Sequence, residues 1–265
     1  MNAWTRVSAG VFRPQVASVA LSEQPASTHR SVDKQERVLT ADEEACLQLF
    51  GEDNINTDWN DEFQSLYDLS VFTPHEISAA NSKKRELFDR FMLFSRSVAE
   101  QLVRQLSQPI DRWIIRPIRG AGWAGGEKFK VGNLFCKFAR DDKGLYGGND
   151  ERAVKMAKNE IRCGNALLQL RLSSLHLSMM VCHRVHGHAI ITTALIPITG
   201  DSLVYGSCDA ARTVHRSLPL MNELVDRAAA QLNLMPHSIA NQPADVKLSV
   251  GVDCEGHVSQ EDGRL

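Results

Sequence analysis

The chain lacks an apolar run long enough to cross a membrane, and it lacks an excess of charge of either sign. The longest apolar stretch, AIITTALIPI at 189–198, is interrupted by two threonines and a proline, whereas a membrane helix needs about 20 apolar residues. The 30 Lys and Arg nearly balance the 32 Asp and Glu, for a net charge of −2. The whole surface therefore does not attract nucleic acid, and any RNA contact requires a local basic patch.

The chain also lacks any C-x-x-C pair, although it has six cysteines. They are scattered along the sequence: Cys46, Cys136, Cys163, Cys182, Cys208 and Cys254. Cys136 and Cys182 lie in apolar runs typical of strands, where a free thiol behaves as a small apolar side chain. The spacing indicates free thiols in a reducing compartment rather than a disulfide framework.

The N-terminal segment, residues 1–40, has few apolar side chains to bury. It contains prolines and the polar stretch SEQPASTHRSVDKQER, which is typical of a disordered tail. It also has Arg6 and Arg13 and no acid before Glu23, a composition shared with mitochondrial transit peptides. We favour the disordered tail and place the folded domain at residues 41–265.

Apolar periodicity predicts helices separated by short strands. The helices are expected over residues 40–51, 81–107, 151–170 and 218–233. Thr40 stands three residues before Glu43, the spacing of a capping box. Short β-type runs at 113–115 and 131–139 and a hairpin turning near Gly187 predict strands. The fold class is α+β: a helical N-terminal portion packed on a mixed, mainly antiparallel sheet with flanking helices.

A glycine run lies between the first two predicted strands. Gly120, Gly122 and Gly125 fit G-x-G-x-x-G, but a strand follows them, which excludes a dinucleotide-binding turn. The order instead matches a kinase-type glycine loop, with Lys137 on the next strand and Glu160 on the following helix. The sequence has no H-R-D catalytic loop and no D-F-G metal ligand. A kinase-like nucleotide-binding fold without catalytic residues therefore stays open, and no cofactor is expected.

Basic residues follow one face of the helix predicted at 151–170. They step by three, three and four positions, so they share a face: Arg152, Lys155, Lys158 and Arg162. A second basic group comes earlier in the chain: Arg112, Arg116 and Arg119. Trp113, Trp123 and Phe129 lie near that group in sequence and are expected to offer stacking surfaces for bases. Together they predict a surface for an RNA backbone; the alternative is an ordinary solvated helix face.

Cys182, His183, His186 and His188 fall within seven residues. A zinc site usually takes pairs of ligands from two elements, whereas His186 and His188 flank Gly187 at the tip of the predicted hairpin. We therefore expect polar turn residues here and no metal site. The chain also lacks the G-x-S-x-G motif of a serine nucleophile, and no catalytic residue is predicted.

Several motifs in register resemble the clustered-mitochondria (CLU) family. TDWNDEFQSL at 57–66 looks like that family's D-W-N-E-E motif, and GGNDERAVKMAKNEIR at 147–162 resembles its G-G-D-E-A-A helix. The segments at 175–198 and 202–215 are similar to its R-G-H…I-I-P-G and Y-G-S-x-D stretches. Order and spacing agree from about residue 50 to the end, and several motifs in register are more specific than one.

Individual residues can be matched to these motifs. Gly187 and His188 correspond to the R-G-H turn, and Gly206 and Asp209 correspond to Y-G-S-x-D. Lys137 stands where the family pattern has a serine. The resemblance therefore supports the hairpin over a zinc site and adds nothing to a kinase-type role for Lys137.

The resemblance implies a cytoplasmic, non-enzymatic scaffold that is linked to mitochondrial biogenesis and distribution; mitochondrial targeting is the weaker alternative. Messenger RNA or a protein of the translation machinery is the expected partner, with no DNA and no membrane insertion. The resemblance covers the family's core alone, without its N-terminal ubiquitin-like module and C-terminal TPR repeats. The resemblance also predicts that the core is incomplete at its C-terminal end, because the family pattern continues with a further strand after D-G-R.

Overall fold

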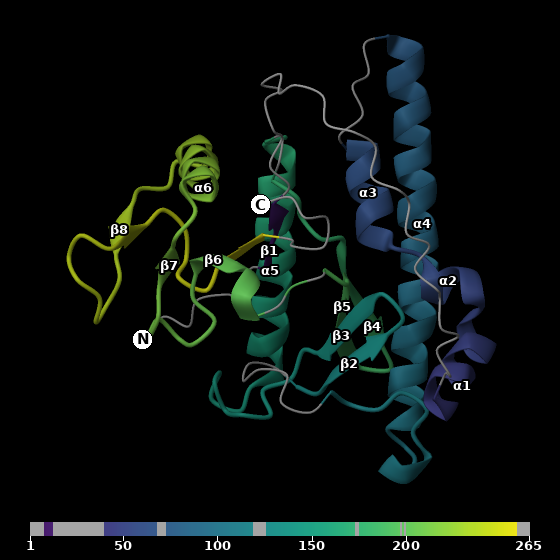
Figure 1. The fold of residues 1–265 in the computed structure, drawn as a ribbon. Helices are drawn as coiled ribbons and strands as arrows, with labels where there is room; N and C mark the ends of the chain where they lie inside the picture. The colour runs from purple at the N-terminus through teal and green to yellow at the C-terminus, as the bar shows by residue number, and fades with distance from the viewer. Residues whose placement is uncertain are drawn as a thin grey trace, which may run out of the picture.

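The centre of the molecule is an antiparallel sheet with helices on both faces (Figure 1). The computed structural model describes residues 8–12 (backbone alone), 40–67, 73–118, 126–172, 175–196, 198 and 200–258. Within these residues a long helix and shorter ones cover one face of the sheet, and a single helix covers the other. The predicted α+β class is confirmed.

The central sheet has the order β2-β3-β5-β4, and each pair of neighbours is antiparallel. Its strands are β2 (Lys128–Val131), β3 (Leu134–Phe138), β4 (Met180–Val185) and β5 (His188–Ala194). The hairpin predicted near Gly187 is confirmed as β4 and β5. His186 and Gly187 join them with φ angles of 45° and 83°, as in the two-residue turns that suit the twist of a hairpin.

A helical layer covers one face of this sheet. Its elements are α1 (Ala41–Phe50), α2 (Glu52–Asn56), α3 (Trp59–Tyr67) and α4 (Pro74–Gln105), followed by a short 3-10 turn, η1 (Ile110–Arg112). Trp59 of α3 and Phe91 and Phe94 of α4 meet Leu134 and Phe138 of β3 in the main cluster of buried apolar side chains. Burial of these large aromatic rings holds the layer on the sheet.

Helix α5 (Asp150–Gln169) covers the opposite face of the sheet. Ala157 and Ile161 of α5 pack on Ala189 and Ile191 of β5. Since the apolar side of the helix faces the sheet, its polar side is left to solvent.

Three strands of the C-terminal part and the N-terminal strand β1 form a second sheet beyond α5, with the order β1-β10-β6-β7 (Figure 1). Its elements are β1 (Ser8–Phe12), η2 (Gly200–Ser202), β6 (Leu203–Gly206), β7 (His215–Arg216) and β10 (Glu255–Val258). Strand β1 runs parallel to β10, whereas the other neighbours are antiparallel. Helix α6 (Pro219–Gln231) and the ribbon of β8 (His237–Ser238) and β9 (Lys247–Leu248) complete this part. The two sheets together are mixed and mainly antiparallel, as predicted.

The predicted helices are present, with one shifted start. The capping box expected at Thr40 is confirmed. The helix predicted at 81–107 begins earlier, at Pro74, because Thr73 and Glu76 form a second capping box and proline occupies the first turn.

One strand prediction is correct only in part, since β3 (Leu134–Phe138) lies within the predicted run 131–139, and another is wrong. The run 131–139 is not one strand, because Gly132, with a φ of 53°, turns the chain between β2 and β3. Residues 113–115 form no strand, because the side-chain amide of Gln105 takes the place of a neighbouring strand. Its oxygen accepts from the backbone N–H of Ile115 (3.2 Å) and its nitrogen donates to the carbonyl of Ile115 (2.7 Å).

The N-terminal segment is only partly described. Ser8–Phe12 forms β1, and the rest of residues 1–39 lies outside the described residues, so the tail stays a prediction, as does the domain boundary at residue 41. Among the described residues, no helix combines the length and apolar character that crossing a bilayer requires.

Candidate functional site

Helix α5 presents a face of positive charge to solvent. The residues predicted from the sequence are all exposed there: Arg152, Lys155, Lys158 and Arg162. Within the described part of the chain, none of them forms an ion pair, and Arg162 donates only to the side chain of Asn159 at 3.4 Å. Cations without a partner are available to a polyanion.

The loop that leads into α5 does not provide an open phosphate site. Asn149 caps the helix, since its side-chain oxygen accepts from the backbone N–H of Arg152 (3.0 Å). The carboxylate of Asp141 accepts from the backbone N–H groups of Tyr146 (2.8 Å) and Gly148 (2.7 Å). These donors resemble those that bind phosphate at helix N-termini, but the protein's own side chains already occupy them.

The second predicted basic group lies on the other side of the sheet. Arg112 and Arg116 follow α4 and are exposed. Arg116 Nε lies 3.0 Å from Asp42 Oδ2 of α1, so its charge is partly engaged. Because α1 and α4 cover the opposite face from α5 (Figure 1), these arginines and the α5 face do not form one surface.

Lys137 and Glu160 form a short ion pair beneath α5. Lys137 Nζ and Glu160 Oε2 lie 2.7 Å apart, and the side chains are 20% and 6% exposed. Lys137 points toward α5 because its neighbours Cys136 and Phe138 face the α4 layer, and side chains alternate along a strand. The structure thus brings together two residues of the predicted nucleotide site. Their role in binding stays a prediction.

The predicted stacking surfaces are corrected by the structure. Trp113 is 7% exposed and Phe129 is 0% exposed, because both rings belong to the core between the sheet and α4. Neither ring can receive a base. Several other predicted residues lie outside the described residues: Arg119, Gly120, Gly122, Trp123 and Gly125.

The histidines near the β4–β5 hairpin have separate surroundings. His183 is buried against α4, with its Nε2 2.8 Å from Ser95 Oγ. His188 Nδ1 lies 3.0 Å from a guanidinium nitrogen of Arg140 and must accept from it. His186 is exposed at the hairpin tip. In the described ranges, no three His, Cys, Asp or Glu side chains are placed to share a metal ion.

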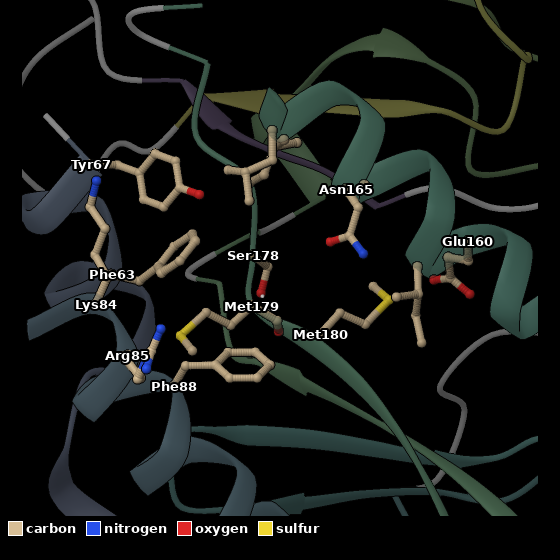
Figure 2. A pocket seen from close by; sticks show the side chains of 14 residues that line it. Phe63, Tyr67, Lys84, Arg85, Phe88, Glu160, Asn165, Ser178, Met179 and Met180 are labelled. Atoms are coloured by element: carbon tan, nitrogen blue, oxygen red, sulfur yellow. Dashed lines mark hydrogen bonds between the residues drawn. The ribbon is translucent and has the colours of Figure 1, made fainter. Parts of the chain in front are cut away.

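A pocket of about 400 Å³ opens between α3 and α4 on one side and α5 on the other, and the sequence did not indicate it. Lys84 and Arg85 lie on its α4 side and Glu160 and Asn165 on its α5 side (Figure 2). Phe88 of α4 is 45% exposed and lines the pocket.

Comparison with known proteins identifies the family. A model of the Clustered mitochondria (CLU) family matches residues 58–265. Clustered mitochondria protein homologs of Anopheles gambiae and Xenopus tropicalis are 25% and 23% identical to the chain over 215 residues, which is 78% of it. Protein clueless of Drosophila willistoni is 37% identical over 83 residues, 31% of the chain and 6% of that protein.

The chain spans 14% of the Anopheles homolog and 16% of the Xenopus homolog. No solved structure matches the chain. The family match extends from α3 through β10, so it includes both faces of the central sheet and the basic face of α5. The chain belongs to the clustered mitochondria family.

Proposed function

We propose that this chain is an RNA-binding scaffold segment of a clustered mitochondria protein, that it acts in mitochondrial distribution and that it catalyses no reaction. The names of its relatives support the link to mitochondria. The observation that carries the RNA contact is the exposed basic face of α5, whose side chains have no carboxylate partner among the described residues. Messenger RNA or an RNA-containing part of the translation machinery has the backbone charge that this face would contact.

The geometry of α5 suits a phosphate backbone. From Arg152 to Arg162 the helix rises about 15 Å, at about 1.5 Å per residue. Four cations spread over this length can each contact a different phosphate of one RNA strand. Since Trp113 and Phe129 are buried, the contact is expected to be to phosphate and to show little sequence preference.

The test is binding of the purified chain to a pool of fluorescent single-stranded RNA, followed by anisotropy. Reversing three charges with Arg152→Glu, Lys155→Glu and Lys158→Glu should weaken binding by at least about tenfold, because each phosphate contact contributes to affinity. These side chains are exposed, so the variant should keep its melting temperature.

A matched control reverses three exposed cations elsewhere, with Lys83→Glu, Arg227→Glu and Lys247→Glu. It changes the net charge by the same amount but leaves the α5 face intact. The proposal predicts that this control keeps most of the affinity. Equal losses in the two variants would mean that only overall charge matters, and the assignment to α5 would then be wrong.

The Lys137–Glu160 ion pair favours a second candidate, nucleotide binding without catalysis. In protein kinases a strand lysine is held by a helix glutamate so that it reaches the phosphates of ATP. Here the same two residue types lie 2.7 Å apart, on β3 and α5, and Lys137 keeps 20% exposure. The pair alone supports this candidate, because the glycine run lies outside the described residues.

A thermal shift measurement with ATP and Mg²⁺ tests this candidate. Binding to the folded chain should raise the melting temperature, and Lys137→Met should remove the shift. Lys130→Met, on the exposed side of β2, is the control that should keep it. Absence of any shift in the unmodified chain would reject nucleotide binding.

A further inference from the structure

The pocket beside α5 has an apolar interior. Its walls carry Phe63 of α3, Phe88 of α4 and Leu168 of α5, together with Met179, which precedes β4, and Met180, the first residue of β4. In Figure 2 the two methionines lie between the α4 side and the α5 side of the pocket. Thioether and aromatic side chains adapt to apolar ligands of irregular shape, and the volume of about 400 Å³ lies within the range of small-molecule sites.

One end of the pocket is cationic. Lys84 Nζ lies 4.5 Å from the centre of the Tyr67 ring, and Arg85 follows it on the same wall. Burial lowers the pKa of Lys84, and the positive charge of Arg171 lowers it further. Among the described residues, neither Lys84 nor Arg85 has a carboxylate within ion-pair distance. This end of the pocket therefore carries positive charge that no carboxylate of the described residues pairs with.

The other end does not neutralise this charge. The carboxylate of Glu160 reaches the pocket wall but is already paired with Lys137 at 2.7 Å. Asn165 offers a neutral amide beside it (Figure 2). The pocket thus combines an apolar interior with positive charge at one end only.

We propose that this pocket binds an amphipathic anion, an apolar chain that carries a single carboxylate or phosphate group. The head group lies between Lys84 and Arg85 and acts as their counter-ion, and the apolar chain lies along Met179 and Met180. Charge-assisted hydrogen bonds fix the head, and burial of the chain supplies the remaining affinity. The site is separate from the basic face of α5 and does not depend on RNA binding.

The test is calorimetric titration of the purified chain with decanoic acid and with decyl phosphate, each below its micelle concentration. Both anions or one of them should bind, and the comparison distinguishes a carboxylate from a phosphate ligand. Decanol should bind at least about tenfold more weakly, since it lacks the charge that a charge-assisted hydrogen bond requires. A decyl ammonium cation should not bind measurably.

A variant that fills the pocket keeps the test specific. A Cβ added at Gly164, which lines the pocket, meets no atom within 4 Å. Gly164→Leu should therefore fold, because it also replaces a helix-disfavouring glycine, and it should abolish binding. Gly164→Ala is its control and should keep binding within about threefold, because one methyl group removes little of the volume.

A second variant removes the proposed contacts to the head group. Replacing both cations with Lys84→Gln and Arg85→Gln should weaken binding of the anions by about tenfold or more and leave binding of decanol unchanged. The proposal is overturned if neither anion binds, if decanol binds as tightly as the anions, or if Gly164→Leu still binds.

Discussion

Gly206 stands where the chain can accept no side chain. Its φ of 84° lies in the left-handed region, and a Cβ there would collide with the carbonyl of Cys254. Three residues on, the carboxylate of Asp209 accepts from the backbone N–H of Thr213 (2.9 Å) and from the hydroxyl of Ser207 (2.8 Å), and these bonds lower its pKa to about 2. The glycine and the aspartate of the Y-G-S-x-D motif are therefore both explained by the conformation of this turn.

Replacing Gly206 tests this account of the motif. Gly206→Ala should lower the free energy of unfolding by roughly 3 kcal/mol, because backbone strain and a steric collision add together. Gly144→Ala is the control: Gly144 has a φ of 70°, but its surroundings are open, so backbone strain alone should cost about 1 kcal/mol. Urea unfolding of the two variants measures the difference, and equal losses would contradict the steric part of the argument.

His183 gives the fold a dependence on pH. Burial and the charge of Arg96 lower its pKa from 6.5, and Glu100 opposes them; the pKa of His188 is also lowered, by burial and by Arg140. Below pH 6.5 the unfolded chain binds a proton at this histidine more readily than the folded chain does. The contribution of a neutral His183 to stability is therefore fully present above pH 6.5 and is lost as the pH falls from 6.5 through the lower pKa of the folded chain.

Chemical unfolding at about pH 8 and about pH 5.5 measures this loss, since the two values lie on either side of an unfolded histidine's pKa. The His183→Gln variant should lose less stability between the two values than the unmodified chain, because its side chain does not titrate. Stability that rises on acidification, or a His183→Gln variant with an unchanged pH dependence, would be inconsistent with a neutral buried His183.

At the scale of the element, local signals predicted the helices better than the strands. A capping box such as that at Thr40 acts within a few residues, so its sequence is sufficient to locate a helix start. The same signal at Thr73 and Glu76 was available and would have placed the start of α4 correctly. Strands depend on their partners: residues 113–115 are apolar enough for a strand, but the side chain of Gln105 satisfies their backbone.

The link between β3 and α5 is predicted to contribute to stability whether or not a nucleotide binds. Lys137→Met leaves the buried carboxylate of Glu160 unpaired, which should lower the free energy of unfolding by about 3 kcal/mol. Adding Glu160→Met should restore most of that loss, because two apolar side chains replace the pair. A double-mutant cycle by urea unfolding measures the coupling, and additive effects would show that the pair contributes nothing.

At the scale of the whole molecule, the sequence predicted the residues of the basic groups but not their arrangement. Helical spacing is enough to place Arg152 and Arg162 on one face of α5. No spacing could show that Arg116 lies across the sheet, because that depends on which face each helix covers. The pocket was missed for the same reason, since its lining comes from α3, α4, α5 and the segment before β4.

The central claim is that α5 binds an RNA backbone, and the salt dependence of binding tests it most directly. With four phosphate contacts, a plot of log affinity against log salt should have a slope of about −3, since each contact on a single strand contributes about −0.7. In the Arg152→Glu, Lys155→Glu, Lys158→Glu variant the magnitude of this slope should fall to about 1 or below, because Arg162 alone remains. No binding at low salt, or the same slope in that variant, would contradict the account.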